Sequence, residues 1–109
     1  MKHMDYIYFE EDYYKNKKDT FSFLIDILKK HTKDNFSLLD LGCSRGELLY
    51  HIQNDIPNHS KLFGLDYSED LINDAKEQDF LNDIGFKIGD AQDFALDRKF
   101  DLICLEICN

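Results

Sequence analysis

Small and acidic residues recur at alternate positions where an apolar run of the chain ends. The series is D-x-G-x-S-x-G, formed by Asp40, Gly42, Ser44 and Gly46. The apolar residues from Leu38 to Leu41 predict a parallel strand that turns sharply into a helix starting near Gly46. Missing side chains in such a turn allow a ligand to lie against the main chain. The pattern therefore predicts a nucleotide-type cofactor site at the carboxyl end of a strand.

Two phosphate-binding patterns fit this segment poorly. A dinucleotide fingerprint, G-x-G-x-x-G, needs a third small residue at position 47, where the chain has Glu47. That carboxylate would face a pyrophosphate at the helix start. A phosphate loop, G-x-x-x-x-G-K-[ST], needs a Lys after its second Gly, and Gly46 is followed by Glu47. We therefore expect a ligand that is not held by its phosphates.

Four segments of the chain, in order, resemble the motifs of the class I S-adenosylmethionine-dependent methyltransferases, and the resemblance covers nearly all of residues 36–109. The segments are Leu38–Gly46, with Ser44 where Gly is commoner, then Leu62–Asp66, Gly89-Asp90-Ala91 and Phe100–Leu105. The resemblance implies an α/β fold with a Rossmann-like, doubly wound parallel sheet. It also implies S-adenosylmethionine as the cofactor.

In that reading, Asp66 accepts hydrogen bonds from both ribose hydroxyls of the cofactor. Gly42 and Gly46 would let the methionine part of the cofactor approach the main chain, with Cys43 and Ser44 between them in the same loop. Asp40 would fix the turn through hydrogen bonds to main-chain N–H groups or to ordered water.

The adenine and ammonium groups of the cofactor would meet residues that follow the later strands. Asp90 would accept a hydrogen bond from the adenine amino group, and the main-chain N–H of Ala91 would satisfy a ring nitrogen. Tyr67 would pack on the adenine face or the ribose. Leu105 would offer its carbonyl to the ammonium group.

Each of these residues also has a purely structural interpretation. Asp90 follows Gly89 and can be a turn residue. Ser68 can cap a helix whose first turn carries Glu69 and Asp70, and this role is compatible with a ribose contact by Asp66. The two loop glycines can serve tight packing alone.

Composition limits the partners of the chain. Its 109 residues form one domain that can build a core, and 43% of them are hydrophobic. With 13 basic and 22 acidic residues the net charge is −9, so we expect neither nucleic acid nor a membrane as a partner. No apolar run approaches the ~18 residues of a membrane span. Together with an odd number of cysteines, this favours a cytoplasmic protein.

Metal and covalent chemistry are not expected. Cys104 and Cys108 are separated by three residues, not two, and the four histidines are scattered without ligand spacing. No order of Ser, His, Asp or Cys supports a nucleophile. We therefore predict no metal site and assign no catalytic residue.

The chain before the motif divides into an arm and a helix. Residues 1–19 carry several tyrosines without a steady period and predict a docked N-terminal arm, in which the tyrosines either pack or form a lid. Residues 20–109 would form the core, with helices over residues 20–31, 46–54 and 69–80 on one side of the sheet. Thr20 would cap the first helix, and Phe21, Leu24, Ile25 and Leu28 would form its buried face.

The last strand is apolar at successive positions, from Leu102 to Leu105, as in a strand covered on both faces. The sequence nevertheless ends at Asn109, whereas three further strands follow in the resembling family. We therefore interpret the chain as the cofactor-binding half of a methyltransferase, truncated after strand 4, with strand order 3-2-1-4. A homodimer through strand 4 or the uncovered sheet face would hide the exposed edge.

The activity implied by the resemblance is methyl transfer to an O, N or C atom of a small molecule. Glu106 is the nearest candidate for a general base, although a role as a surface carboxylate or helix-start residue explains it better. Two alternatives remain. The chain can be a non-catalytic module that binds S-adenosylmethionine, S-adenosylhomocysteine or a protein partner, or it can be an NAD-dependent oxidoreductase, which Glu47 disfavours.

Overall fold

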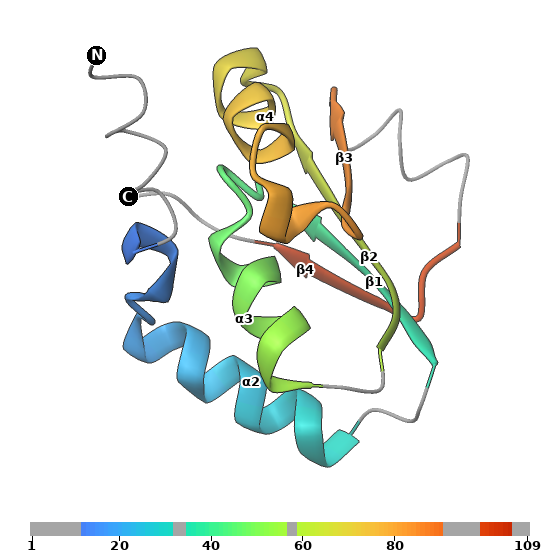
Figure 1. Cartoon of the computed structure of the whole chain (residues 1–109). Coiled ribbons are helices and arrows are strands. Elements are labelled where there is room, and N and C mark those ends of the chain that lie inside the picture. Colours follow the sequence, from blue (N-terminus) through green and yellow to red (C-terminus); the bar gives the residue numbers. More distant parts are fainter. Residues whose placement is uncertain (1–11, 32–34, 57–58, 91–98, 106–109) are drawn as a thin grey trace.

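Four parallel strands form one sheet. The computed structural model describes residues 12–31, 35–56, 59–90 and 99–105. The strands are β1 (Phe36–Leu41), β2 (His59–Asp66), β3 (Gly85–Ile88) and β4 (Leu102–Leu105), in the spatial order β3-β2-β1-β4 (Figure 1). Every neighbouring pair is parallel. This confirms the predicted strand order and the Rossmann-like class of the fold.

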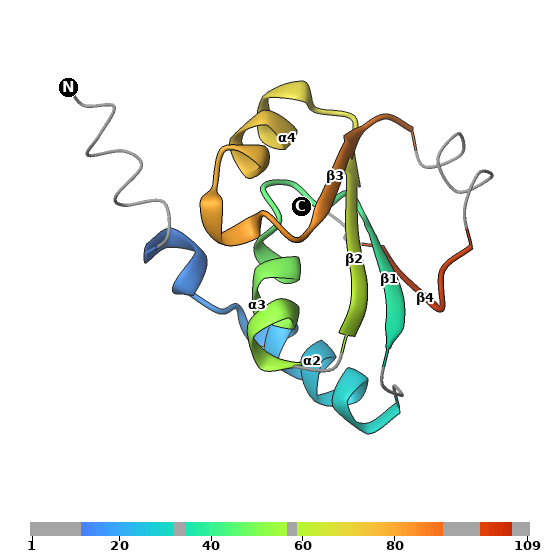
Figure 2. The ribbon, with the colours of Figure 1, turned by 45° about the vertical axis from the view of Figure 1, so that its right-hand side comes forward.

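Three α-helices and a short 3-10 helix lie on one face of this sheet, as the resemblance implies (Figure 2). They are α2 (Asp19–His31), α3 (Glu47–Asp55), α4 (Glu69–Lys76) and the short 3-10 helix η1 (Asp79–Leu81). Phe21, Ile25 and Leu28 of α2 are buried at helical spacing and join the main core cluster. Leu38 of β1 and Ile52 of α3 belong to the same cluster, so the main core fills the space between helices and sheet.

The opposite side of the sheet, hereafter the second face, carries a smaller apolar cluster. Leu39 and Leu65 are buried there, and the rings of Phe63 and Phe100 meet edge to face at 5.4 Å. Because side chains alternate along a strand, Leu39 and Leu41 share this face while Leu38 and Asp40 point toward the helices. Ile103 remains 54% exposed. Within the described residues, the second face has no covering helix.

Two helix boundaries differ from the sequence prediction. Thr20 is not a cap, because α2 already begins at Asp19 and the Lys18 carbonyl accepts the N–H groups of Phe21 and Ser22. The helix that begins at Glu69 ends at Lys76, well before Phe80. There the N–H of Glu77 is shared between the carbonyls of Asn73 and Asp74, which tightens the last turn.

Aromatic packing accounts for that early end. The break after Lys76 allows the Phe80 ring to lie 5.2 Å from the ring of Tyr14 and 5.6 Å from that of Tyr50. At the other end of α4, Ser68 accepts a hydrogen bond from the N–H of Leu71, which confirms its predicted role as the cap. In the described part of the chain, no helix is long and apolar enough to cross a membrane.

His51 on α3 is a buried histidine that lies beside aromatic residues of the main core. Its side chain is 4% exposed, and its ring lies 5.1 Å from that of Tyr50 and 6.1 Å from that of Phe21. Burial, assisted by the positive charge of Lys17, lowers the pKa of His51 below its ordinary value. Asp55 and a hydrogen bond to the main chain of Tyr14 act in the opposite direction and are weaker.

We therefore predict that the fold loses stability on acidification through His51. The unfolded chain takes up the proton first, so stability present above about pH 6.5 falls as the pH drops toward the lower pKa of the folded state. Thermal unfolding followed by circular dichroism between about pH 7.5 and about pH 5 measures this loss. His51→Phe should show a shallower dependence on pH, and identical slopes in the two proteins would contradict the prediction.

Candidate functional site

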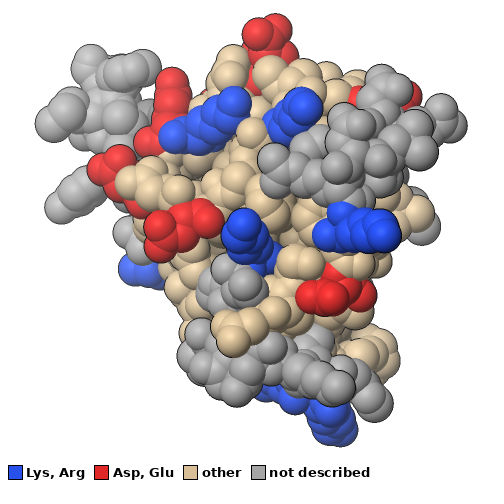
Figure 3. Space-filling view, turned by 90° about the vertical axis from the view of Figure 1, so that its right-hand side faces the viewer, with Lys and Arg blue, Asp and Glu red and all other residues tan. Residues whose placement is uncertain are grey.

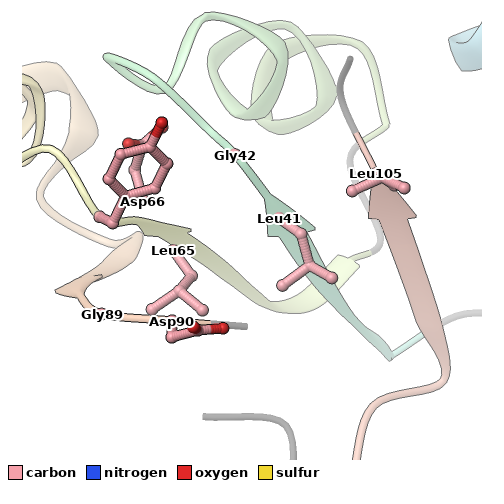
Figure 4. Close-up of a pocket in the computed structure, with 8 residues that line it drawn as sticks. Leu41, Gly42, Leu65, Asp66, Gly89, Asp90 and Leu105 are labelled. Carbon is pink, nitrogen blue, oxygen red and sulfur yellow. The ribbon is translucent and has the colours of Figure 1, made fainter. Parts of the chain in front are cut away.

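A pocket of about 390 Å³ lies at the carboxyl ends of the strands, a volume within the range of small-molecule sites (Figure 4). Its lining residues are Leu41, Gly42, Leu65, Asp66, Tyr67, Gly89, Asp90 and Leu105. They come from the ends of β1, β2 and β4 and from the turn after β3. Parallel strands present their carboxyl ends at the same edge, which is why segments distant in sequence meet here.

A row of three leucines forms the apolar floor of the pocket. Leu41 is the register partner of Leu65 on one side and of Leu105 on the other. Figure 4 shows these three side chains on neighbouring strand ends. Leu41, Leu65 and Gly89 were not predicted as site residues. Aligning the three strand ends by their motifs would have placed both leucines beside Leu105, because side chains at the same register position share a face.

The loop from β1 to α3 reverses the chain through three left-handed residues. Gly42, Ser44 and Gly46 have φ angles of 74°, 57° and 85°. Glycine adopts this conformation freely, whereas a residue such as Ser44 holds it at a cost on the order of 1 kcal/mol. The alternate spacing of small residues in the sequence therefore reflects this backbone path.

Every main-chain N–H from residue 42 to residue 46 has an acceptor within the protein. Gly42 and Cys43 donate to the Leu65 carbonyl (2.8 and 3.0 Å), Ser44 to Asp66 Oδ2 (2.9 Å), Arg45 to Glu47 Oε1 (3.0 Å) and Gly46 to the Cys43 carbonyl (2.9 Å). A phosphate-binding loop works by pointing such groups at the ligand. In this loop the N–H groups donate instead to acceptors of the protein itself.

Asp66 is held in place by two of these main-chain groups. Its Oδ2 accepts from the N–H of Ser44 and its Oδ1 accepts from the N–H of Ser68, both at 2.9 Å. The carboxylate therefore joins the loop between β1 and α3 to the start of α4. The side chain is 9% exposed and borders the pocket. A carboxylate offers about four lone-pair sites, and these two bonds leave about two for a ligand.

The structure brings half of the predicted site residues to the pocket. Gly42, Asp66, Tyr67, Asp90 and Leu105 line it, and the Tyr67 side chain is 86% exposed. Asp40 and Cys43 are fully buried and do not line it; Asp40 points toward the helix-covered face. Ala91 and Glu106 lie outside the described residues.

Gly46 has a packing role away from the pocket. A Cβ atom at this position would lie 2.8 Å from Cζ of Phe86, so the missing side chain makes room for that ring. Cys43 likewise packs against the sheet, since its Sγ would lie 2.7 Å from a Cβ placed on Gly64. The two residues support the loop from the side of the main core.

The pocket lining carries negative charge. Among the described residues that line it, Asp66 and Asp90 carry carboxylates and none is Lys or Arg. The face in Figure 3 shows basic and acidic side chains interspersed among the described residues, with no continuous basic stripe. The described residues also hold no group of three His, Cys, Asp or Glu side chains that could bind a metal ion. The site is therefore suited to a neutral or cationic ligand.

Comparison with known proteins places this arrangement among methyltransferases. A family described as a methyltransferase domain matches residues 32–109. The dTDP-3-amino-3,4,6-trideoxy-alpha-D-glucopyranose N,N-dimethyltransferase of Streptomyces venezuelae is 32% identical over 80 residues, which are 73% of this chain and 32% of that protein. The chain thus spans about a third of the length of the curated relatives it matches.

Solved structures agree with this comparison. DesVI of Streptomyces venezuelae superimposes with a TM-score of 0.61 at 31% identity, covering 80% of this chain and 35% of that one. The plantazolicin methyltransferase BpumL, solved with S-adenosylhomocysteine (SAH), gives a TM-score of 0.64 at 25% identity and covers 90% of this chain and 40% of that one.

We predict that Gly46→Ala destabilises the fold by about 1 to 3 kcal/mol, because the new Cβ meets the Phe86 ring on a strained backbone. The matched control is Gly89→Ala, whose Cβ would meet only Leu65 Cδ1 at 3.7 Å. Urea unfolding gives both free energies of unfolding. Equal losses in the two variants would show that contact with Phe86 is not what requires glycine at position 46.

Proposed function

This chain belongs to the class I S-adenosylmethionine-dependent methyltransferases, and from that membership we propose that its pocket binds S-adenosylmethionine. One observation carries the proposal: every main-chain N–H of residues 42–46, in the loop beside the pocket, already has an acceptor within the protein. The described residues of the lining include two carboxylates, Asp66 and Asp90, and neither Lys nor Arg. A phosphate group would therefore find no free N–H donor in residues 42–46 and no basic side chain among the described lining residues. S-adenosylmethionine has no phosphate, and its sulfonium and ammonium groups are positive.

Asp66 would hold the ribose. Its carboxylate is fixed by Ser44 and Ser68, and its remaining lone pairs suit two ribose hydroxyls. Gly42, at φ 74° beside the pocket, would leave room for the methionine part of the cofactor. Asp90 and Tyr67 would contact the adenine, and the Leu105 carbonyl would accept from the ammonium group. The predicted contact of Ala91 with the adenine ring belongs to the same proposal.

When bound, the cofactor would supply an electrophilic methyl group for an O, N or C atom of a small-molecule acceptor. The residues of this chain would contribute positioning, with the leucine floor excluding water from beneath the cofactor. The glucopyranose derivative in the name of one relative is compatible with a small-molecule acceptor. A cytoplasmic location, without nucleic-acid or membrane partners, completes the proposal and is consistent with the net charge of −9.

We predict that SAH binds in a calorimetric titration while NAD does not. Asp66→Ala should weaken SAH binding roughly tenfold to over a hundredfold, because about 1.5 to 3 kcal/mol is lost with hydrogen bonds to a charged acceptor. Gly42→Val should abolish binding by filling the pocket.

The matched control for Asp66→Ala is Asp83→Ala, which removes an exposed carboxylate that does not line the pocket. Circular dichroism establishes that each variant is folded, and Asp66→Asn provides a milder change if the alanine variant unfolds. Unchanged SAH affinity in a folded Asp66 variant would remove this residue from the site. A labelled-methyl assay with candidate acceptors separates an enzyme from a module that only binds the cofactor.

We further propose that two copies of this chain pair through β4. This strand is at the edge of the described sheet, and its side chains on the second face, Ile103 and Leu105, are 54% and 70% exposed. Such edges recruit other strands, and a symmetric dimer closes the assembly.

Sedimentation at micromolar concentration tests the pairing. We predict that Ile103→Lys shifts the protein toward monomer, because it places a charge in the apolar contact. Ile27→Lys, an equivalent change at a 39% exposed position of α2, should leave the distribution unchanged. A concentration-independent monomer in the unaltered protein would contradict the proposal.

A further inference from the structure

Residues 13–17 lie along α3 and make side-chain contacts with its first and last residues. The Tyr13 hydroxyl donates to the carboxylate of Glu47, the first residue of α3, and Lys17 pairs with Asp55, the last. The Arg45 guanidinium also lies 5.8 Å from the centre of the Tyr13 ring. Desolvation and the hydrogen bond to Glu47 raise the pKa of Tyr13 to about 12, so its hydroxyl keeps its proton at neutral pH.

Tyr14, in the middle of this segment, is fully buried. Its ring lies 5.6 Å from that of Tyr50 and 5.2 Å from that of Phe80, so aromatic contacts fix its orientation. Its hydroxyl donates to the main-chain carbonyl of Arg45 at 2.6 Å. A buried tyrosine hydroxyl requires such a partner, and here the partner belongs to the loop that borders the pocket.

The Arg45 carbonyl lies where a hydrogen bond to it restrains the conformation of residues 42–46. It belongs to the peptide unit between Arg45 and Gly46, whose N–H donates to the Cys43 carbonyl at 2.9 Å. It also precedes α3, which begins at Glu47 after a cap residue without a side-chain hydrogen bond. Tyr14 therefore fixes this peptide unit from the helix side, while Asp66 holds Ser44 from the pocket side.

We propose that Tyr14 is a positioning residue for the cofactor site. Its hydroxyl holds the Arg45–Gly46 peptide and thereby keeps residues 42–46 in the shape that places Gly42 at the pocket. Neither Tyr13 nor Tyr14 lines the pocket, so both act from behind the loop and not as a lid. Tyr14 also precedes residue 32, where the family match begins. The identity of the ligand rests on the proposed function, whereas the hydrogen bond from Tyr14 to the Arg45 carbonyl does not.

The test compares Tyr14→Phe with Tyr50→Phe. Each change removes one hydroxyl from the same aromatic cluster and keeps the ring, but only Tyr14 bonds to the loop carbonyl. Amide hydrogen exchange of the ligand-free proteins reports on opening of residues 42–46, because all five N–H groups are hydrogen-bonded. We expect faster exchange in Tyr14→Phe alone. We also expect its SAH dissociation constant to rise about twofold to tenfold, as loss of one hydrogen bond allows.

The outcomes separate this inference from the proposed function. Unchanged loop exchange in Tyr14→Phe would overturn the positioning role whatever the binding result. Equal effects of both variants on exchange and binding would also overturn it, because they would assign the effect to the ring cluster. If the unaltered protein fails to bind SAH, the proposed function and the proposed ligand are wrong. Faster amide exchange in Tyr14→Phe would still establish that Tyr14 holds the loop.

Discussion

The arrangement of the site depends on one carboxylate that bridges two segments of main chain. Asp66 ends β2 and accepts the N–H of Ser44 from the first loop and the N–H of Ser68 at the start of α4. These bonds compensate for burial of the charge and set the distance between the two loops that border the pocket. They also stabilise the left-handed conformation of Ser44, which is unfavourable for a residue with a side chain. The position of the ribose in the proposed complex follows from this anchored group.

The main-chain N–H groups of residues 42–46 donate to acceptors within the protein, and this limits the ligand groups that the loop can bind. In many α/β proteins the turn after the first strand offers N–H groups to phosphate, together with the positive end of a helix. Here Glu47 and Asp66 occupy the N–H groups of Arg45 and Ser44. In the proposed complex, these N–H groups are therefore not available to a phosphate. The row of leucines beneath it supplies the apolar contact that a cofactor without phosphates needs.

The sequence by itself determined the features that depend on local patterns. Alternate small residues from Asp40 to Gly46 identified the turn, because a left-handed backbone path selects for small side chains over a few positions. The apolar runs and the acidic residues that follow them located the strand ends, and the resemblance then ordered the strands as 3-2-1-4. Ser68 was identified as a cap for the same reason, since a cap acts on an N–H three residues away.

Only the tertiary structure decided which of these residues line the pocket and which support the loop. Gly42 and Gly46 are equivalent in the sequence pattern, but Gly46 faces Phe86, a ring from a distant strand. The early end of α4 reflects packing of Phe80 against Tyr14, and the support of Arg45 by Tyr14 joins residues 31 positions apart. The physical reason is that periodicity and turn chemistry act over a few residues, whereas burial and hydrogen bonds between segments depend on how the chain folds back on itself.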